Sequence, residues 1–130
     1  MKVIQRDFLP DDLARLLTEN KIDGCVTVQA DQSETETQFL LELASKNSFV
    51  KGVVGWVDLQ SAGLNKQLEF YTGFKKLKGI RHILQAEPVG FMRGQDFSKG
   101  IGVLKQFNLT YDVLIFPHQI ADAIWLVSQH

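Results

Sequence analysis

The stretch Phe49-Val50-Lys51-Gly52-Val53-Val54-Gly55-Trp56-Val57-Asp58 carries the clearest structural signal in this chain. It is short, rich in β-branched and aromatic residues and almost continuously apolar, which indicates a strand buried on both faces. Apolar residues at helical spacing lie on both sides of it, in residues 33–47 and 61–72. A buried strand between two helices is typical of a parallel α/β sheet, because each parallel connection needs a covering crossover.

The alternation of helix and strand continues towards both termini. Pro10 favours the first turn of a helix, where its missing N–H is not needed, and Ser33 with Glu36 fits the capping-box pattern. Gly100 and Gly102 weaken the helical pattern around them. The whole pattern predicts strands at residues 24–30, 49–58, 77–84 and 110–116, and helices at residues 10–20, 33–47, 61–72, 97–107 and 120–130.

Two architectures are compatible with this pattern in a single domain spanning residues 1–130. One is a small open sheet of the flavodoxin type, which is complete at this length. The other is part of a (β/α)8 TIM barrel, which normally needs about 250 residues. Composition and periodicity do not choose between them.

The composition is that of an ordinary globular chain, with 45% hydrophobic and 22% charged residues. Fourteen Lys and Arg against fifteen Asp and Glu give a net charge of −1, which argues against a nucleic-acid or membrane-surface partner. The single Cys25 forms no internal disulfide and no cysteine zinc site, so we expect a reduced, cytoplasmic protein. Residues 1–6 become polar too early for a signal peptide, and no apolar run approaches about 20 residues.

Four phrases, taken together, resemble one protein family. The resemblance is to the TIM-barrel, metal-dependent amidohydrolases, in the branch that holds sugar lactonases and pyrone-dicarboxylate lactonase. It implies a partial TIM barrel of about four strands and an origin in an enzyme that opens lactones or related cyclic esters of sugar acids. The phrases are Asp7-Phe8-Leu9-Pro10-Asp11-Asp12-Leu13, Gly52-Val53-Val54-Gly55-Trp56-Val57-Asp58-Leu59, Leu77-Lys78-Gly79-Ile80-Arg81-His82, and Leu109-Thr110-Tyr111-Asp112-Val113-Leu114 with Pro117-His118-Gln119.

The histidines depart from the family pattern. The family opens with a His-x-His strand and adds a later metal-site histidine and a catalytic Asp, whereas this chain has only His82, His118 and His130. The resemblance implies zinc or manganese in the complete barrel. A catalytic metal needs about three protein ligands, so we expect no metal in this chain alone and little or no activity. The resemblance implies that the chain corresponds to the second to fifth strands of such a barrel.

Arg81 is the strongest candidate for substrate binding. Chemistry in TIM barrels lies at the carboxyl ends of the strands, and an arginine inside a buried strand needs an anionic partner. Its planar fork suits a substrate carboxylate or a lactone oxygen, and the resemblance gives the matching arginine that role. The alternative is a structural ion pair with Asp58 or Asp112 across neighbouring strands. His82 points to the face opposite Arg81, as a hydrogen-bonded core histidine.

Other polar or aromatic residues also follow the predicted strands. Asp58 is the candidate catalytic carboxylate, acting as a base or hydrogen-bond acceptor, or else it caps the helix that opens at Ser61. Trp56 either stacks on a sugar ring or packs in the core. The remaining candidates for substrate contact are Gln29, Gln85 and His118, the last of which is otherwise an exposed loop histidine.

Two function hypotheses follow. The first is a fragment or reduced member of a metal-dependent lactone hydrolase with a small-molecule substrate, a lactone or sugar acid. The second is a non-enzymatic α/β module with a flavodoxin-like open sheet that binds a small molecule or a partner. In a partial barrel both sheet edges expose unpaired N–H and C=O groups, so we expect a homo-oligomer, formed by edge pairing or by a two-chain barrel.

Overall fold

A computed structural model describes residues 5–130 and contains one parallel sheet of four strands. The strands are β1 (Cys25–Val28), β2 (Val50–Gly55), β3 (Leu77–Ile83) and β4 (Thr110–Leu114), and they lie side by side in the order β1-β2-β3-β4. The interpretation of the polar N-terminus falls partly on residues 1–4, which lie outside the described residues.

This sequential order distinguishes the two architectures that the sequence left open. A flavodoxin-like sheet has the order 2-1-3-4-5, in which the chain reverses direction across the sheet. Here every strand pairs in parallel with the next strand along the chain. Such a sheet winds in one direction, as the wall of a (β/α)8 barrel does. The predicted partial barrel of four strands is confirmed.

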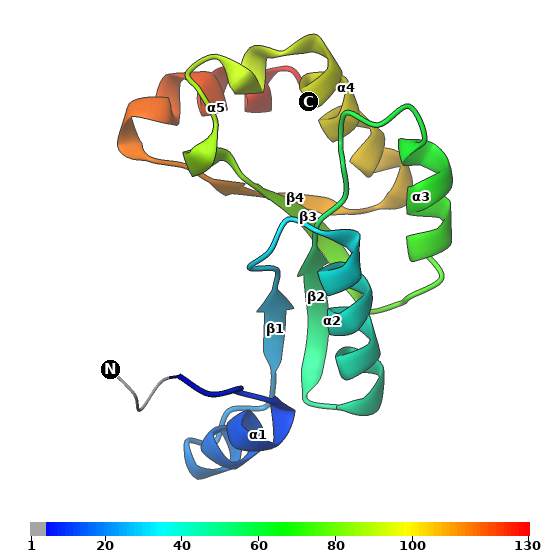
Figure 1. Cartoon of the computed structure of the whole chain (residues 1–130), viewed down its shortest axis with the longest axis vertical. Helices are drawn as coiled ribbons and strands as arrows, with labels where there is room; N and C mark the ends of the chain where they lie inside the picture. The colour runs from blue at the N-terminus through cyan, green and yellow to red at the C-terminus, as the bar shows by residue number, and fades with distance from the viewer. Residues whose placement is uncertain (1–4) are drawn as a thin grey trace.

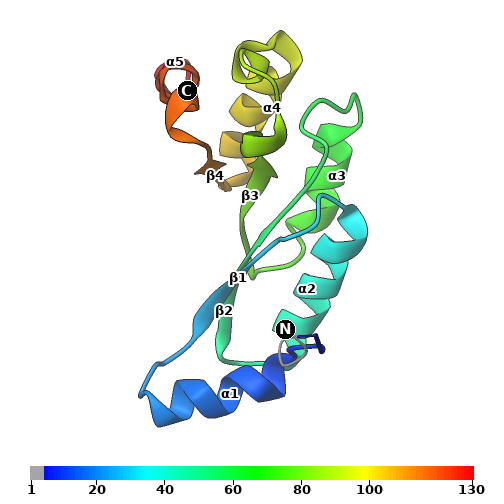
Figure 2. The same cartoon turned by 60° about the vertical axis from the view of Figure 1, so that its left-hand side comes forward.

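The helices alternate with the strands, as predicted. Figure 1 shows α2 and α3 on one side of β1 and β2, and Figure 2 shows the same arrangement from another direction. At the far end of the sheet, α5 packs beside the short helical turns that follow β3 and β4. The bounds are α1 (Pro10–Glu19), α2 (Glu34–Lys46), α3 (Leu64–Tyr71), α4 (Gln95–Leu104) and α5 (Ile120–Ser128), with 3₁₀ turns at η2 (Leu84–Ala86), η3 (Phe91–Arg93), η4 (Lys105–Phe107) and η5 (Pro117–Gln119).

The start of α2 differs from the predicted capping box in one respect. The Ser33 hydroxyl accepts a hydrogen bond from the backbone N–H of Glu36, as expected. The Glu36 carboxylate reaches further back and accepts from the N–H groups of Ala30 and Asp31, at 3.0 and 2.8 Å. It therefore fixes the turn between β1 and α2 rather than only the first turn of the helix.

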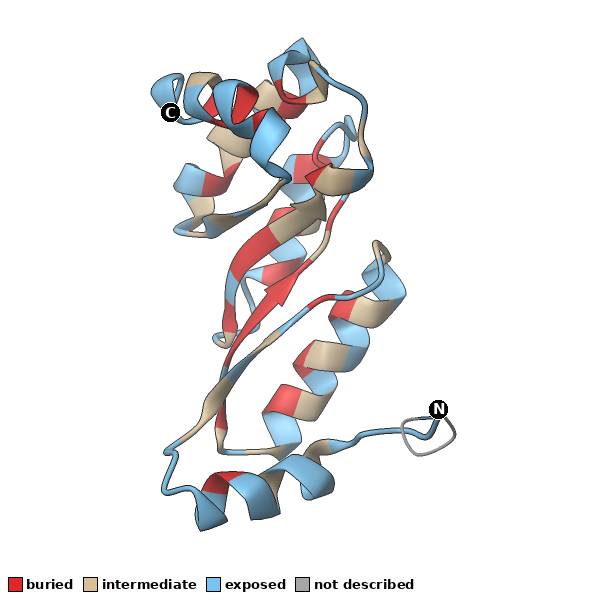
Figure 3. Ribbon diagram, turned by 90° about the vertical axis from the view of Figure 1, so that its left-hand side faces the viewer, coloured by how far each residue is buried: buried red, intermediate tan, exposed pale blue. Residues whose placement is uncertain are grey.

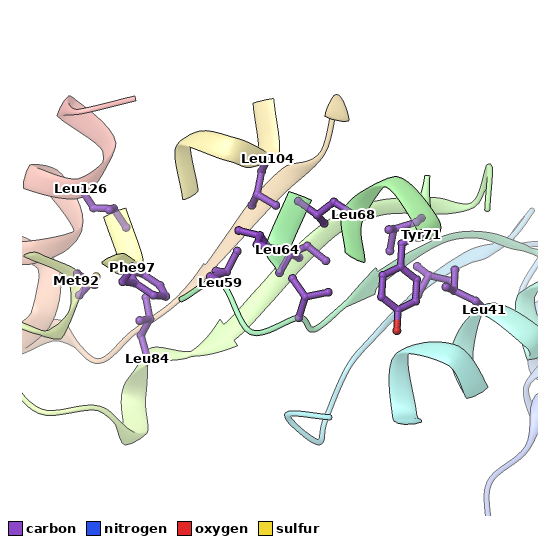
Figure 4. Close-up of a cluster of buried hydrophobic side chains, with 14 of the residues drawn as sticks. Leu41, Leu59, Leu64, Leu68, Tyr71, Leu84, Met92, Phe97, Leu104 and Leu126 are labelled. Carbon is purple, nitrogen blue, oxygen red and sulfur yellow. The ribbon is translucent and has the colours of Figure 1, made fainter. Parts of the chain in front are cut away.

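The hydrophobic core lies between the helices and the sheet. Figure 4 shows leucines of α3 and α4 meeting the segment that follows β2, together with Tyr71 and Phe97. Buried residues concentrate on β2 and β3 in Figure 3. In β1, Cys25 and Thr27 are half-buried, whereas Val26 and Val28 are 54% and 38% exposed. One row of β1 side chains thus has no cover from the described part of the chain.

Candidate functional site

Arg81 and Gln29 join the carboxyl ends of two strands that are not neighbours. Arg81 lies near the end of β3, and its Nε and Nη2 donate to Gln29 Oε1 at 3.1 and 2.8 Å. Nη2 also donates to the Gln29 backbone carbonyl. Gln29 continues β1, because its own backbone N–H donates to the Val54 carbonyl of β2 at 2.8 Å. A guanidinium from β3 therefore reaches across β2 to β1.

The Gln29 side chain is fully buried and only half satisfied. Its oxygen is used by Arg81, whereas its Nε2 makes no hydrogen bond with any residue between 5 and 130. A buried donor without a partner costs about 1–3 kcal/mol. The amide therefore presents N–H donors beside the guanidinium, and two donor groups together suit an oxygen-rich, anionic acceptor.

Neither of the proposed structural ion pairs of Arg81 forms within the described residues. Asp112 is the register partner of Arg81 on β4, yet the two side chains form no salt bridge. Asp58 is exposed, and its Oδ1 accepts from the Gln60 backbone N–H at 3.0 Å, closing the turn that leads towards α3. The charge of Arg81 is therefore neutralised by no carboxylate in this part of the protein.

Trp56 is held at the carboxyl end of β2 by hydrogen bonds to two residues, Thr37 and His82. The Thr37 hydroxyl of α2 bonds both the N–H and the carbonyl of Trp56, each at 2.8 Å. The indole Nε1 donates to Nδ1 of His82 at 3.3 Å. His82 is a hydrogen-bonded, largely buried histidine, whose other nitrogen lies 2.7 Å from the Glu87 carboxylate.

Gln85 and His118 lie near the carboxyl ends of β3 and β4, as the sequence predicted. Gln85 Nε2 approaches the Ile115 carbonyl at 3.4 Å, which bridges η2 and the segment after β4. His118 lies in η5 and stacks on Phe116, with ring centroids 5.9 Å apart. In the described structure neither side chain forms a hydrogen bond with Arg81 or Gln29, so these two candidates stay separate from the Arg81–Gln29 pair.

Three polar residues at this end of the sheet were not singled out from the sequence. Gln32 accepts from the Ile83 backbone N–H at 2.7 Å, and Gln119 donates to the Leu84 carbonyl at 2.8 Å. Glu87 pairs with His82. In the sequence all three resemble solvated loop residues, and the only signal was the position of Gln119 in the phrase Pro117-His118-Gln119.

Two ionisable groups near this end have shifted pKa values. Burial raises the pKa of Tyr111, whose ring packs edge-on against Phe97. A hydrogen bond from Arg93 and a second from the Gly90 backbone N–H lower the pKa of Asp122. Both groups therefore keep one protonation state at neutral pH: the Tyr111 phenol stays neutral and the Asp122 carboxylate stays charged.

The described residues do not assemble a metal-binding cluster. No three His, Cys, Asp or Glu side chains between residues 5 and 130 come together in a way that could hold a metal ion. His82 is occupied by Trp56 and Glu87, and His130 lies 3.1 Å from the Ser98 hydroxyl. His118 stands apart from both, in η5.

An apolar groove of about 360 Å³ lies elsewhere, between α1, β1 and α2. Leu13 and Leu16 of α1 line it, together with Phe39 and Leu43 of α2. The groove contains little that could do chemistry, so the candidate site is at the strand ends. None of the helices in residues 5–130 has both the length and the apolar character needed to cross a bilayer.

Parallel strands in sequential order, alternating with helices, define the class of fold as part of a TIM barrel. Comparison with known proteins agrees. The L-fucono-1,5-lactonase of Burkholderia multivorans is 38% identical over 141 residues, covering 100% of this chain and 47% of that enzyme. The L-fucono-1,5-lactonase of Burkholderia ambifaria is 32% identical over 121 residues, covering 92% of this chain and 42% of that enzyme.

Solved structures show the same relationship. An amidohydrolase from Burkholderia multivorans, crystallised once with bound HEPES and once with bound zinc, superposes with a TM-score of 0.93 at 37% identity. The match covers 100% of this chain and 46% of that one. No family model matches the sequence. Over its whole length the chain matches a fragment of a TIM-barrel amidohydrolase, and it spans about half the length of the relatives that it matches.

Proposed function

We propose that this chain forms part of a hydrolase that opens lactones of sugar acids. The observation that carries the proposal is the pair of Arg81 and Gln29, which places at the strand ends a guanidinium that has no carboxylate partner among residues 5–130. The likeness to two L-fucono-1,5-lactonases supports this class of substrate. A sugar lactone and its product offer the carbonyl, carboxylate and hydroxyl oxygens that such donors bind.

The roles of the individual residues follow from lactone chemistry. Attack of water on the ring carbonyl develops negative charge on oxygen, and fixed donors aimed at that oxygen lower the barrier. Arg81 supplies such a donor, or holds a substrate carboxylate, and Gln29 fixes its orientation. Asp58 is the carboxylate that we assign to accepting a proton from the attacking water. The residues assigned to contacts with the sugar are Trp56, Gln85 and His118.

The zinc of the related amidohydrolase does not fit the residues described here. A catalytic metal site uses about three protein ligands and an open position. The part of the chain that the structure describes contains no such group of side chains, because its histidines are dispersed. We therefore derive no step through a metal from these residues and limit their roles to binding, orientation and proton transfer.

The experiment is a hybrid enzyme in which residues 5–130 replace the matching segment of the Burkholderia multivorans lactonase. We expect Arg81→Ala in this hybrid to lower kcat/KM for L-fucono-1,5-lactone by about 100-fold or more, as expected for loss of an oxyanion donor. Arg15→Ala is the matched control, because Arg15 is exposed on α1 and pairs with Glu19 of the same helix. An Arg81→Ala hybrid as active as its parent would remove Arg81 from the mechanism.

We also propose that the isolated chain self-associates. The sheet has two edges, β1 and β4, and two copies together contain the eight strands of a closed barrel. The exposed row of β1, Val26 and Val28, is an apolar surface beside an unpaired edge, which is the feature that promotes strand pairing. We therefore propose that a second copy of this chain pairs with the β1 edge.

Light scattering over a dilution series tests this proposal. We expect a mass of two chains, and Val26→Lys should shift the chain towards the monomer, because a lysine blocks edge pairing. Val89→Lys is the control: Val89 is 79% exposed but lies between η2 and η3, far along the chain from β1. A folded, unsubstituted monomer at every concentration would refute self-association.

A further inference from the structure

Both ring nitrogens of His82 are engaged. The Trp56 indole Nε1 lies 3.3 Å from Nδ1, and the Glu87 Oε1 lies 2.7 Å from Nε2. The ring stacks on Phe91, with centroids 5.4 Å apart and planes 19° apart, and meets Phe97 edge-on. Only 12% of the His82 side chain is exposed. A largely buried imidazole thus links the end of β2 to the segment after β3.

The chemistry of the two partners fixes the protonation of the ring. An indole N–H can only donate, so Nδ1 must accept with its lone pair. A neutral imidazole then carries its proton on Nε2, which donates to the Glu87 carboxylate. A second proton on Nδ1 would point at the indole N–H and break that bond. The same proton would turn the hydrogen bond between His82 and Glu87 into an ion pair and strengthen it.

We propose that His82 is a positioning residue that holds the Trp56 indole when neutral, releases it when protonated, and keeps Glu87 in both states. Because Trp56 follows β2 at the end of the sheet where the candidate site lies, release changes what the site offers to a ligand. This consequence for the ligand rests on the proposed function. The hydrogen-bond switch itself does not, since it needs no substrate.

Among residues 5–130, Glu87 is the charged side chain that contacts His82, and the nearby Tyr111 phenol of β4 is kept neutral because burial raises its pKa. Glu87, directly after η2, contacts Nε2, and the Trp56 indole donates to Nδ1. Phe91 of η3, Phe97 of α4 and the register partner Val113 of β4 are uncharged. The neighbouring Arg81 directs its guanidinium to Gln29 instead.

The test is a nitrogen–nitrogen coupling measured by NMR across the Trp56–His82 hydrogen bond in ¹⁵N-labelled chain. Trp125→Phe leaves Trp56 as the only tryptophan, since the sequence contains two. We expect the coupling at about pH 8 and its loss at about pH 5, the range in which histidines change charge. The Trp56 fluorescence of this variant should change over the same range.

Two variants separate the switch from other effects. His118→Gln removes another histidine and should leave the coupling and the fluorescence transition unchanged. His82→Gln should remove the fluorescence transition. The proposal is overturned if the folded chain lacks the coupling at about pH 8, if the coupling persists after His82 is protonated, or if His118→Gln abolishes the transition. Because no substrate is present, failure here leaves the lactonase proposal standing, and the reverse also holds.

Discussion

Gly100 shows how one missing side chain sets the position of a helix. A Cβ at Gly100 would lie 2.8 Å from the carbonyl carbon of Leu59 and closer still to its oxygen, and both are backbone atoms that cannot rotate away. Gly102, on the same helix α4, has only the His130 ring near its Cβ position, at 3.1 Å. The glycine that weakened the helical pattern in the sequence is therefore required for α4 to touch the segment after β2.

Gly100→Ala should destabilise the chain by about 1–3 kcal/mol, the usual cost of overpacking a core. Gly102→Ala is the matched control and should change stability by less than about 1 kcal/mol, because alanine favours the helix and the His130 ring can move. Urea denaturation followed by circular dichroism measures both. Equal stabilities for the two variants would contradict the close approach of α4 to Leu59.

The contact between Arg81 and Gln29 marks the limit of sequence reasoning at this scale. The sequence identified both residues as candidates because each is polar and close to the end of an apolar strand. Their direct contact spans 52 positions along the chain and depends on the order of the strands. The alternative interpretation from the sequence assigned Arg81 a carboxylate partner, because the charge of a residue is easier to anticipate than the direction of a buried amide.

At the scale of the elements, strands were easier to predict than helix ends. The predicted strand over residues 49–58 contains β2 (Val50–Gly55), because the apolar run continues into a buried connection. The helix predicted from Ser61 begins at Leu64, since the Ser61 N–H and carbonyl are used in turns with Asp58 and Leu64. Periodicity reports which residues are buried, whereas helix ends depend on local hydrogen bonds.

Asp122 connects α5 to η3, and this connection depends on pH. Its carboxylate accepts from Arg93 Nε at 2.5 Å and from the Gly90 N–H at 2.9 Å. Gly90 has a φ of +88°, a conformation that favours glycine. The hydrogen bond from Arg93, followed by that from Gly90, lowers the pKa of Asp122 in the folded chain. The ionised Asp122 carboxylate therefore stabilises the folded chain fully above the pKa of an aspartate in the unfolded chain, about 3.9. This stabilisation is lost as the pH falls through the lower pKa that Asp122 has in the folded chain.

Asp122→Asn should therefore make the stability of the folded chain depend less on pH at acidic pH. The unsubstituted chain should lose thermal stability between about pH 5 and pH 2, and the variant should start lower and lose less over that range. Thermal melting at several pH values measures the difference. Asp23→Asn, an exposed site between α1 and β1, is the control and should follow the unsubstituted chain. A parallel decline of the Asp122→Asn and unsubstituted curves would exclude the link.

At the scale of the whole molecule, the sheet is a continuous part of a barrel wall. Its strands follow one another without reversal, and β1 leaves Val26 and Val28 exposed. The carboxyl ends of β1 and β3 meet through Arg81 and Gln29. Ligands for a catalytic metal do not come together in residues 5–130. The lactonase chemistry proposed here therefore depends on residues beyond those that this sheet provides.

The most direct measurement is the rate at which the hybrid barrel, with residues 5–130 in place of the matching half of the Burkholderia multivorans lactonase, opens L-fucono-1,5-lactone. If this chain supplies an equivalent part of the same wall and site, kcat/KM of the zinc-loaded hybrid should lie within about 100-fold of the parent enzyme, a difference of about 2.7 kcal/mol. A hybrid that folds and binds zinc but opens no lactone would contradict the assignment of this chain to a lactone-hydrolysing barrel.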